Sequence, residues 1–212
     1  MTTPRCSQPD VVDSRAWVEQ VLAPYGIQPE EAANLGLELV LPDEAARRLH
    51  TEQAIPSAGL WIAYPRVCGY GQLLLQKPLP QIMRNGCVRL VEYIAPWQLP
   101  KHAFIPLGLQ ANQSANPDEP IILIVGELAA LSFMRGGLAN IIGLQAPDGW
   151  WDEQQQVLVP ELNEVMTPGR RFVWLFPVHA TWREDYRQGL ERFDQECRER
   201  GCVLQIGQLP NS

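Results

Sequence analysis

The chain has 212 residues, of which 46% are hydrophobic and 19% are charged, and its formal net charge is -7. A chain of this length and composition forms either one α/β domain with a smaller appendage or two compact units with a buried core. Because binding through phosphate neutralisation requires an excess of Lys and Arg, the acidic balance restricts any nucleic-acid binding to local or weak contacts.

Apolar runs and cysteines indicate the cellular compartment of the protein. The first residues contain no apolar run behind a basic segment, and the longest apolar run considered is IILIV at 121–125. We therefore expect a cytoplasmic protein that is neither secreted nor inserted in a membrane. The five cysteines are odd in number and form no CxxC pair, which predicts reduced thiols instead of a zinc ribbon or a complete disulfide framework.

Residues 1–55 are predicted to form a small helical segment. Pro29 and Pro42 are each followed by two acids, a pattern that is favoured in the first turn of a helix. An arrangement similar to a helix-turn-helix stays open. The first helix is indicated by apolar residues at helical spacing behind Asp13 or Ser14, namely Val18, Val21, Leu22 and Tyr25.

Residues 56–110 change to a β pattern. Short runs rich in apolar and aromatic residues are separated by glycines, prolines and an Asn-Gly pair. They predict a small, irregular antiparallel sheet. The runs are GLWIAYPRV, GQLLLQKPL, CVRLVEYIA and HAFIPL.

Residues 111–212 are predicted to form an α/β domain. Strand patterns at 121–125, 139–144, 170–176 and 202–209 alternate with two helix patterns, which indicates a mainly parallel sheet flanked by helices. We expect Ile122, Ile124, Ile141, Val173, Leu175 and Val203 to be buried in its strands. The second helix is indicated by Trp182, Tyr186, Leu190, Phe193 and Cys197, and we expect Leu128, Leu131, Tyr186 and Phe193 to pack on the sheet.

Several segments, in this order, resemble one known family. They are YGIQPEEAANLGLELVLPDEAARRL, WIAYPR, VEYIAPW with AFIPL, IILIVGELAAL, RRFVWLFPVHA and CRERGCVLQIGQLP. Together they resemble the Toprim-like domain of unknown function at the head of many phage, plasmid and cyanobacterial primase-helicase proteins. The resemblance covers nearly the whole chain and implies a Toprim-like (Rossmann-like) fold for the C-terminal half.

The resemblance also locates a vestigial catalytic site. A Toprim site uses a glutamate after its first strand and two aspartates after a later strand, because Mg²⁺ prefers oxygen ligands and binds phosphate oxygens. The matching positions here are Val125, Pro177 and His179, beside Gly126 and Glu127. All three acids are absent. The resemblance therefore implies a protein without Toprim catalysis, without bound metal and without a cofactor.

The residues alone leave other interpretations open. Glu127 is favoured in the first turn of a helix by the helix dipole, and Asp148 is expected to shape an Asp-Gly turn. An enzyme with relocated chemistry would use Glu127, Asp148, His179 or Asp185 at the strand ends. A nucleotide sensor would bind an anion at the backbone N–H groups that follow Gly126.

The predicted function is a non-catalytic binding or assembly module linked to DNA replication or to nucleic-acid processing by mobile elements. We expect a protein partner, with nucleic acid bound only weakly by the isolated chain; the oligomeric state stays open. Large aromatic side chains anchor many protein interfaces. The candidate nucleic-acid residues are Arg170, Arg171 and Arg183, and the candidate partner-binding residues are Trp97, Trp150 and Trp151.

Overall fold

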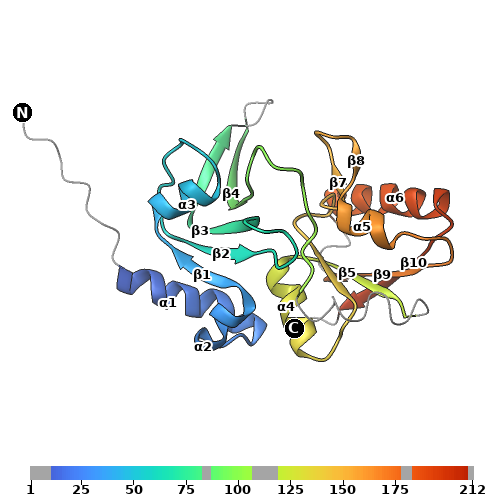
Figure 1. Cartoon of the computed structure of the whole chain (residues 1–212), viewed down its shortest axis with the longest axis horizontal. Helices are drawn as coiled ribbons and strands as arrows, with labels where there is room; N and C mark the ends of the chain where they lie inside the picture. The colour runs from blue at the N-terminus through green and yellow to red at the C-terminus, as the bar shows by residue number, and fades with distance from the viewer. Residues whose placement is uncertain (1–10, 83–86, 107–118, 178–182, 210–212) are drawn as a thin grey trace, which may run out of the picture. The chain divides into compact units, whose positions relative to one another are not determined.

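The computed structural model describes residues 11–82, 87–106, 119–177 and 183–209. They belong to two compact units, residues 1–98 and residues 99–212. The fold is mixed α/β, with a four-stranded antiparallel sheet in the first unit and a four-stranded parallel sheet in the second (Figure 1). Within the described ranges, no helix is both long enough and apolar enough to cross a membrane.

The first unit consists of short helices and one antiparallel sheet (blue to green in Figure 1). The strand order is β1-β2-β3-β4, and neighbouring strands run antiparallel, as the β pattern predicted for β2, β3 and β4. Its helices are α1 (Val11–Leu22), η1 (Ala23–Tyr25), α2 (Pro29–Ala32), η2 (Ala33–Leu35) and α3 (Pro42–Arg48), and its strands are β1 (Leu37–Val40), β2 (Gly59–Ala63), β3 (Gly71–Ile82) and β4 (Val88–Ile94).

The segment 1–55 is not wholly helical. The prolines begin α2 and α3 as predicted, but β1 lies between these helices and pairs with β2 from Leu37↔Ile62 to Val40↔Gly59. Both ends of β1 are buried. A strand of four residues is too short to show a clear period, and this one is held by partners 19 to 25 residues away, so the local pattern could not reveal it.

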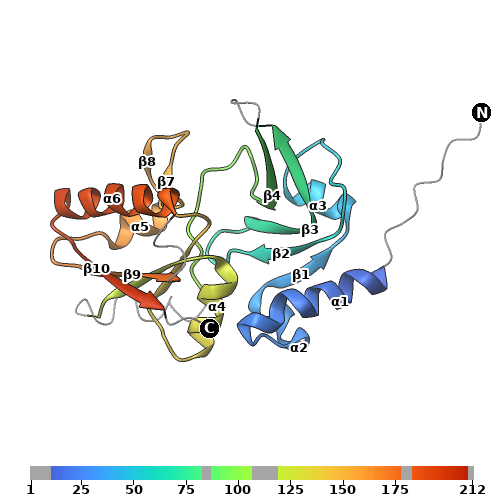
Figure 2. The same ribbon diagram turned by 180° about the vertical axis from the view of Figure 1, so that it is seen from behind.

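The second unit contains the predicted parallel sheet, in the order β10-β9-β5-β6. Figure 2 shows it from behind. The segment HAFIPL, expected in the antiparallel sheet, instead joins this unit through one bridge, Phe104↔Gly143. The elements are β5 (Ile121–Val125), α4 (Glu127–Arg135), β6 (Ile141–Leu144), β7 (Trp151–Asp152), β8 (Val157–Leu158), α5 (Pro160–Val165), β9 (Arg171–Pro177), α6 (Glu184–Glu199) and β10 (Val203–Leu209).

One face of this sheet carries the core of the second unit. The ring of Phe193 on α6 stands edge-on to Phe172 and Trp174 of β9, with centroids 5.7 and 5.2 Å apart. As predicted, Tyr186 and Phe193 are buried against the sheet, and Leu128 and Leu131 of α4 are buried. Such a fully enclosed aromatic cluster makes α6 a rigid support for whatever lies on its other side.

The expected set of buried strand residues is only partly correct. Ile124 and Ile141 are buried, but Ile122, Val173 and Leu175 are half-buried and Val203 is 48% exposed. The buried partners in β9 are instead the alternate residues, which face α6. Because β10 is an edge strand and the two faces of the sheet are not covered equally, an apolar run does not imply burial on both faces. Trp182 lies outside the described residues.

Candidate functional site

The expected Toprim positions meet at one edge of the parallel sheet. Val125 ends β5 and Pro177 ends the neighbouring strand β9, and the carboxyl ends of parallel strands lie at the same edge. The structure thus brings Val125, Gly126 and Glu127 to the same edge as the backbone of Pro177. His179, the remaining expected position, lies outside the described residues.

The polar groups at this edge already serve the fold. Gly126 has φ 103°, a conformation that favours glycine, and is the N-cap of α4. Its N–H donates to the carbonyl oxygen of Leu144 over 2.8 Å, and its own carbonyl accepts from the N–H of Ala130. Glu127 is only 1% exposed. The N–H of Gly126 is therefore not available to an anion.

The three candidate arginines do not form one cluster. Arg170 and Arg171 lie at the amino end of β9, whereas Arg183 is the N-cap of α6. The sixteen residues of α6 span about 24 Å, with Arg183 at the amino end of the helix. The carboxyl end of α6 lies near Arg170, because the Gly169 N–H donates to the carbonyl oxygen of Gly201. Arg183 also donates twice to Asp185, over 3.1 and 2.5 Å, and this lowers the pKa of the Asp185 carboxyl.

The candidate tryptophans lie in different units and differ in exposure. Trp97 belongs to the first unit and is 66% exposed. Trp150 and Trp151 follow β6 in the second unit, where Trp150 is 4% exposed and Trp151 is half-buried. The Trp150 ring packs edge-on against Phe193 at 5.4 Å and tilts 60° from Trp151 at 5.8 Å. Trp150 is thus an element of the core, and only Trp97 is broadly exposed.

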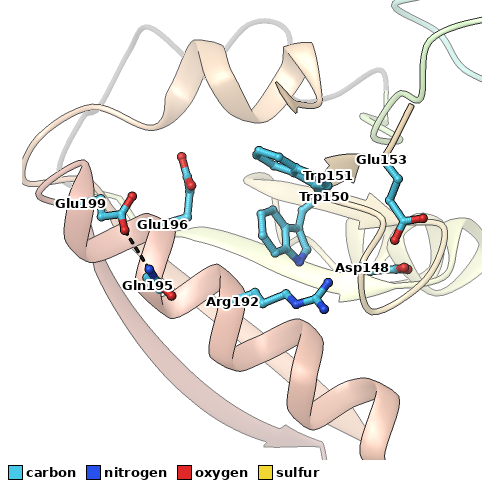
Figure 3. Close-up of a pocket in the computed structure, with 8 residues that line it drawn as sticks. All are labelled: Asp148, Trp150, Trp151, Glu153, Arg192, Gln195, Glu196 and Glu199. Atoms are coloured by element: carbon cyan, nitrogen blue, oxygen red, sulfur yellow. Dashed lines mark hydrogen bonds between the residues drawn. The ribbon is translucent and has the colours of Figure 1, made fainter. Parts of the chain in front are cut away.

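A pocket of about 200 Å³ lies between the Trp150-Trp151 segment and α6 (Figure 3). Six of its eight lining residues are polar or charged, and the two tryptophans supply apolar surface. The chain folds this way because Phe193 and Cys197 anchor one face of α6 in the core, which leaves the neighbouring face toward the segment. The lining residues are Asp148, Trp150, Trp151 and Glu153 from the segment, and Arg192, Gln195, Glu196 and Glu199 from α6.

The segment that forms one wall is held by Asp152, which is 5% exposed. Its carboxylate accepts from the backbone N–H groups of Lys101, Gln154 and Gln155 over 2.9, 2.9 and 3.1 Å. Burial alone would raise the pKa of Asp152, but these hydrogen bonds outweigh burial and hold the pKa below its ordinary value. Asp152 is therefore an ionised structural clamp for the pocket wall.

Some lining groups have partners and others do not. Glu196 binds Arg200 over 2.6 Å, and Glu199 accepts from Gln195 over 2.9 Å. Within the described part of the chain, the buried Nε1–H of Trp150 has no hydrogen-bond acceptor. In the same part of the chain, the charged ends of Arg192, Asp148 and Glu153 take no ion pair. One buried N–H without an acceptor and charged groups of both signs without an ion pair thus line one pocket.

A second polar pair was not foreseen. His102 Nδ1 lies 2.7 Å from Glu161 Oε1, and Glu161 Oε2 accepts from the N–H of Ala103 over 2.9 Å. The two partners are far apart in sequence and join a loop to α5, a helix that the sequence pattern did not predict. Because both oxygens of Glu161 bind this loop, the pair fixes the 101–103 segment beside the Asp152 clamp.

No group of three or more His, Cys, Asp or Glu side chains among residues 11–82, 87–106, 119–177 and 183–209 is arranged to hold a metal ion. No protein-family model matches the chain, and neither curated proteins nor solved structures show significant similarity to it.

Proposed function

We propose that the protein is a non-catalytic, Toprim-like binding or assembly module of a DNA-replication or mobile-element system, with the α6 pocket as its binding site. The observation that carries the proposal is the convergence of unpaired polar groups on this pocket. A buried donor without an acceptor costs folding free energy, so a ligand that supplies the acceptor gains affinity.

The strand edge supports the non-catalytic part of the proposal. A Toprim reaction requires carboxylate oxygens to hold Mg²⁺. Val125 has no oxygen in its side chain, and neither does proline at position 177. Since Glu127 is buried at the start of α4, it contributes at most one carboxylate to this edge. A single buried carboxylate is a poor Mg²⁺ site.

The charge distribution supports a partner-first mode, in which the chain binds a protein partner and contacts nucleic acid weakly or only in the complex. At a net charge of -7 the long-range field of the protein repels phosphate. The candidate basic pair is Arg170 with Arg171, at the start of β9. Two arginines release few counterions, so the isolated chain should bind DNA weakly with a shallow salt dependence. The link to replication rests on the family resemblance.

Calorimetry with Mg²⁺ and Mn²⁺, set beside assays of DNA cleavage and primer synthesis, tests the proposal. We expect no saturable metal binding at millimolar concentrations and no turnover. Glu127→Ala is the informative variant, and Glu164→Ala, an exposed acid on α5, is its matched control. Metal-dependent turnover that is lost in Glu127→Ala and kept in Glu164→Ala would contradict the proposal.

A mobility-shift assay tests the nucleic-acid part. We expect weak binding by the isolated chain that changes little between low and moderate salt, and little further loss on changing Arg170 and Arg171 to Ala. Tight, sequence-specific binding that this double change abolishes would overturn the partner-first mode.

A further inference from the structure

Two groups at the pocket are hydrogen-bond donors only: the buried Nε1–H of Trp150 and the exposed guanidinium of Arg192. Trp150 is 4% exposed, and its Nε1–H has no partner in the described part of the chain. Figure 3 shows the indole nitrogen on the side of the ring that faces the Arg192 guanidinium. A guanidinium beside an indole N–H is suited to a carboxylate, because both groups only donate.

The pocket also contains two carboxylates that take no ion pair in the described part of the chain, those of Asp148 and Glu153. Figure 3 shows Asp148 and Glu153 on one side of Trp150 and Glu196 with Glu199 on the other. The lining contains four acids and one cation, Arg192, which disfavours a phosphate or a simple anion. Because Glu196 is paired with Arg200 and Glu199 accepts from Gln195, an added cation would lie against Asp148 and Glu153. A ligand that carries both an ammonium and a carboxylate complements both sets of groups.

The volume of the pocket and its tryptophan walls restrict the size and polarity of the ligand further. A volume of about 200 Å³ is smaller than the roughly 300–1,000 Å³ of pockets that hold drug-sized ligands. The two tryptophans, tilted by 60°, give the pocket apolar surface. The ligand is therefore small, with an apolar portion that contacts indole.

We infer that the pocket binds a free α-amino acid with an apolar side chain. Its carboxylate accepts from the Trp150 Nε1–H and from Arg192, its ammonium lies against Asp148 and Glu153, and its side chain contacts Trp151. This inference deepens the proposed function and rests on it, since the module would then report the level of an amino acid to its partner.

The test follows the indole N–H resonance of Trp150 by NMR, assigned with Trp150→Phe, during separate titrations with leucine, valine and phenylalanine. Two matched probes dissect leucine: 3-methylbutylamine lacks the carboxylate, and 4-methylpentanoate lacks the ammonium. We expect saturable shifts with at least one amino acid, and binding at least about tenfold weaker for each truncated probe.

Variants on α6 provide the control. Arg192→Gln should weaken amino-acid binding at least about tenfold, whereas Arg187→Gln, on the same helix and outside the pocket lining, should leave it unchanged. Arg192 is exposed, so its variant tests the inference even if Trp150→Phe does not fold.

Three outcomes would overturn the inference: no shift with any of the three amino acids, equal binding of 3-methylbutylamine and leucine, or equal losses in the two arginine variants. None of them depends on metal or turnover. Failure of this inference is therefore distinguishable from failure of the proposed function, which is measured by Glu127-dependent catalysis.

Discussion

The carboxyl edge of β5 and β9 and the α6 pocket lie in the same unit but differ in how their polar groups are used. At the strand edge the Gly126 N–H is bound to Leu144, and Glu127 is buried. In the pocket, the Nε1–H of Trp150 and the guanidinium of Arg192 lack partners within the described residues. Groups with unmet hydrogen bonds mark a ligand site more directly than positions inherited from a motif.

The two regions also differ in the packing that holds them in place. The pocket rests on the aromatic cluster around Phe193, whereas Val125 is only half-buried at the end of its strand. A rigid support keeps binding groups in a fixed geometry. Mutations in the aromatic cluster and at the strand edge therefore test whether the two regions differ in packing.

The largest effect is expected from Phe193→Ala. The ring is fully buried and contacts Phe172, Trp174 and Trp150, so its loss should cost about 3–5 kcal/mol of unfolding free energy. Val125→Ala at the strand edge should cost about 1 kcal/mol, since it removes part of a half-buried side chain. Urea unfolding measures both, and similar costs would mean that the pocket has no denser support than the edge.

Asp152→Asn should cost about 1–3 kcal/mol at neutral pH, because it weakens three hydrogen bonds that hold the pocket wall. The pKa of Asp152 is lowered in the folded state, so its contribution is present above the ordinary Asp pKa of about 4 and is lost as the pH falls through the lowered folded value. The penalty of the variant should shrink at acidic pH. Asp185→Asn, in an exposed pair, is the control, and an equal penalty there would argue against the clamp.

Thiol labelling tests whether the inner face of α6 is closed to solvent. Burial, the main cause, raises the pKa of Cys197 to about 12, and Cys202 is also buried. Cys68 and Cys87 are exposed. At pH 8 we expect fast labelling of Cys68 and Cys87 and labelling of Cys197 and Cys202 only after unfolding, as mapped by mass spectrometry. Fast labelling of Cys197 would show that the inner face of α6 is open.

The smallest effect is expected from Arg187→Gln on the outer face of α6. Arg187 pairs with Glu184 over 2.6 Å and with Glu191 over 3.1 Å, but all three side chains are mostly exposed. Such pairs contribute little, so the change in unfolding free energy should stay within about 0.5 kcal/mol. A loss above 2 kcal/mol, on the order of a lost buried hydrogen bond, would show that this face is packed.

The sequence predicted the parallel sheet well because its signals are local. Apolar runs, a glycine before α4 and a glycine after α6 mark strand and helix ends without knowledge of distant partners. The strand β1 and the burial of alternate strand residues were missed, since both depend on which elements cover each face. Asp148 lies in a turn, as its Asp-Gly pair predicted.

The pocket could not be predicted in the same way. Arg192 and Asp148 meet only because α6 docks beside the Trp150 segment, and the alternating charges of α6 indicate an ordinary solvated face. The Asp-Gly-Trp-Trp run was the one available signal. What it could not reveal is that Trp150 turns into the core with its Nε1–H unpaired.

One NMR experiment compares the two regions directly: the Trp150 indole resonance and the Gly126 amide are followed together while leucine and then Mg²⁺ are added. We predict a saturable leucine shift at Trp150, no leucine shift at Gly126, and no saturable Mg²⁺ shift at either. A saturable Mg²⁺ shift at Gly126 and Glu127, with Trp150 unchanged by leucine, would contradict the assignment of function to the α6 pocket.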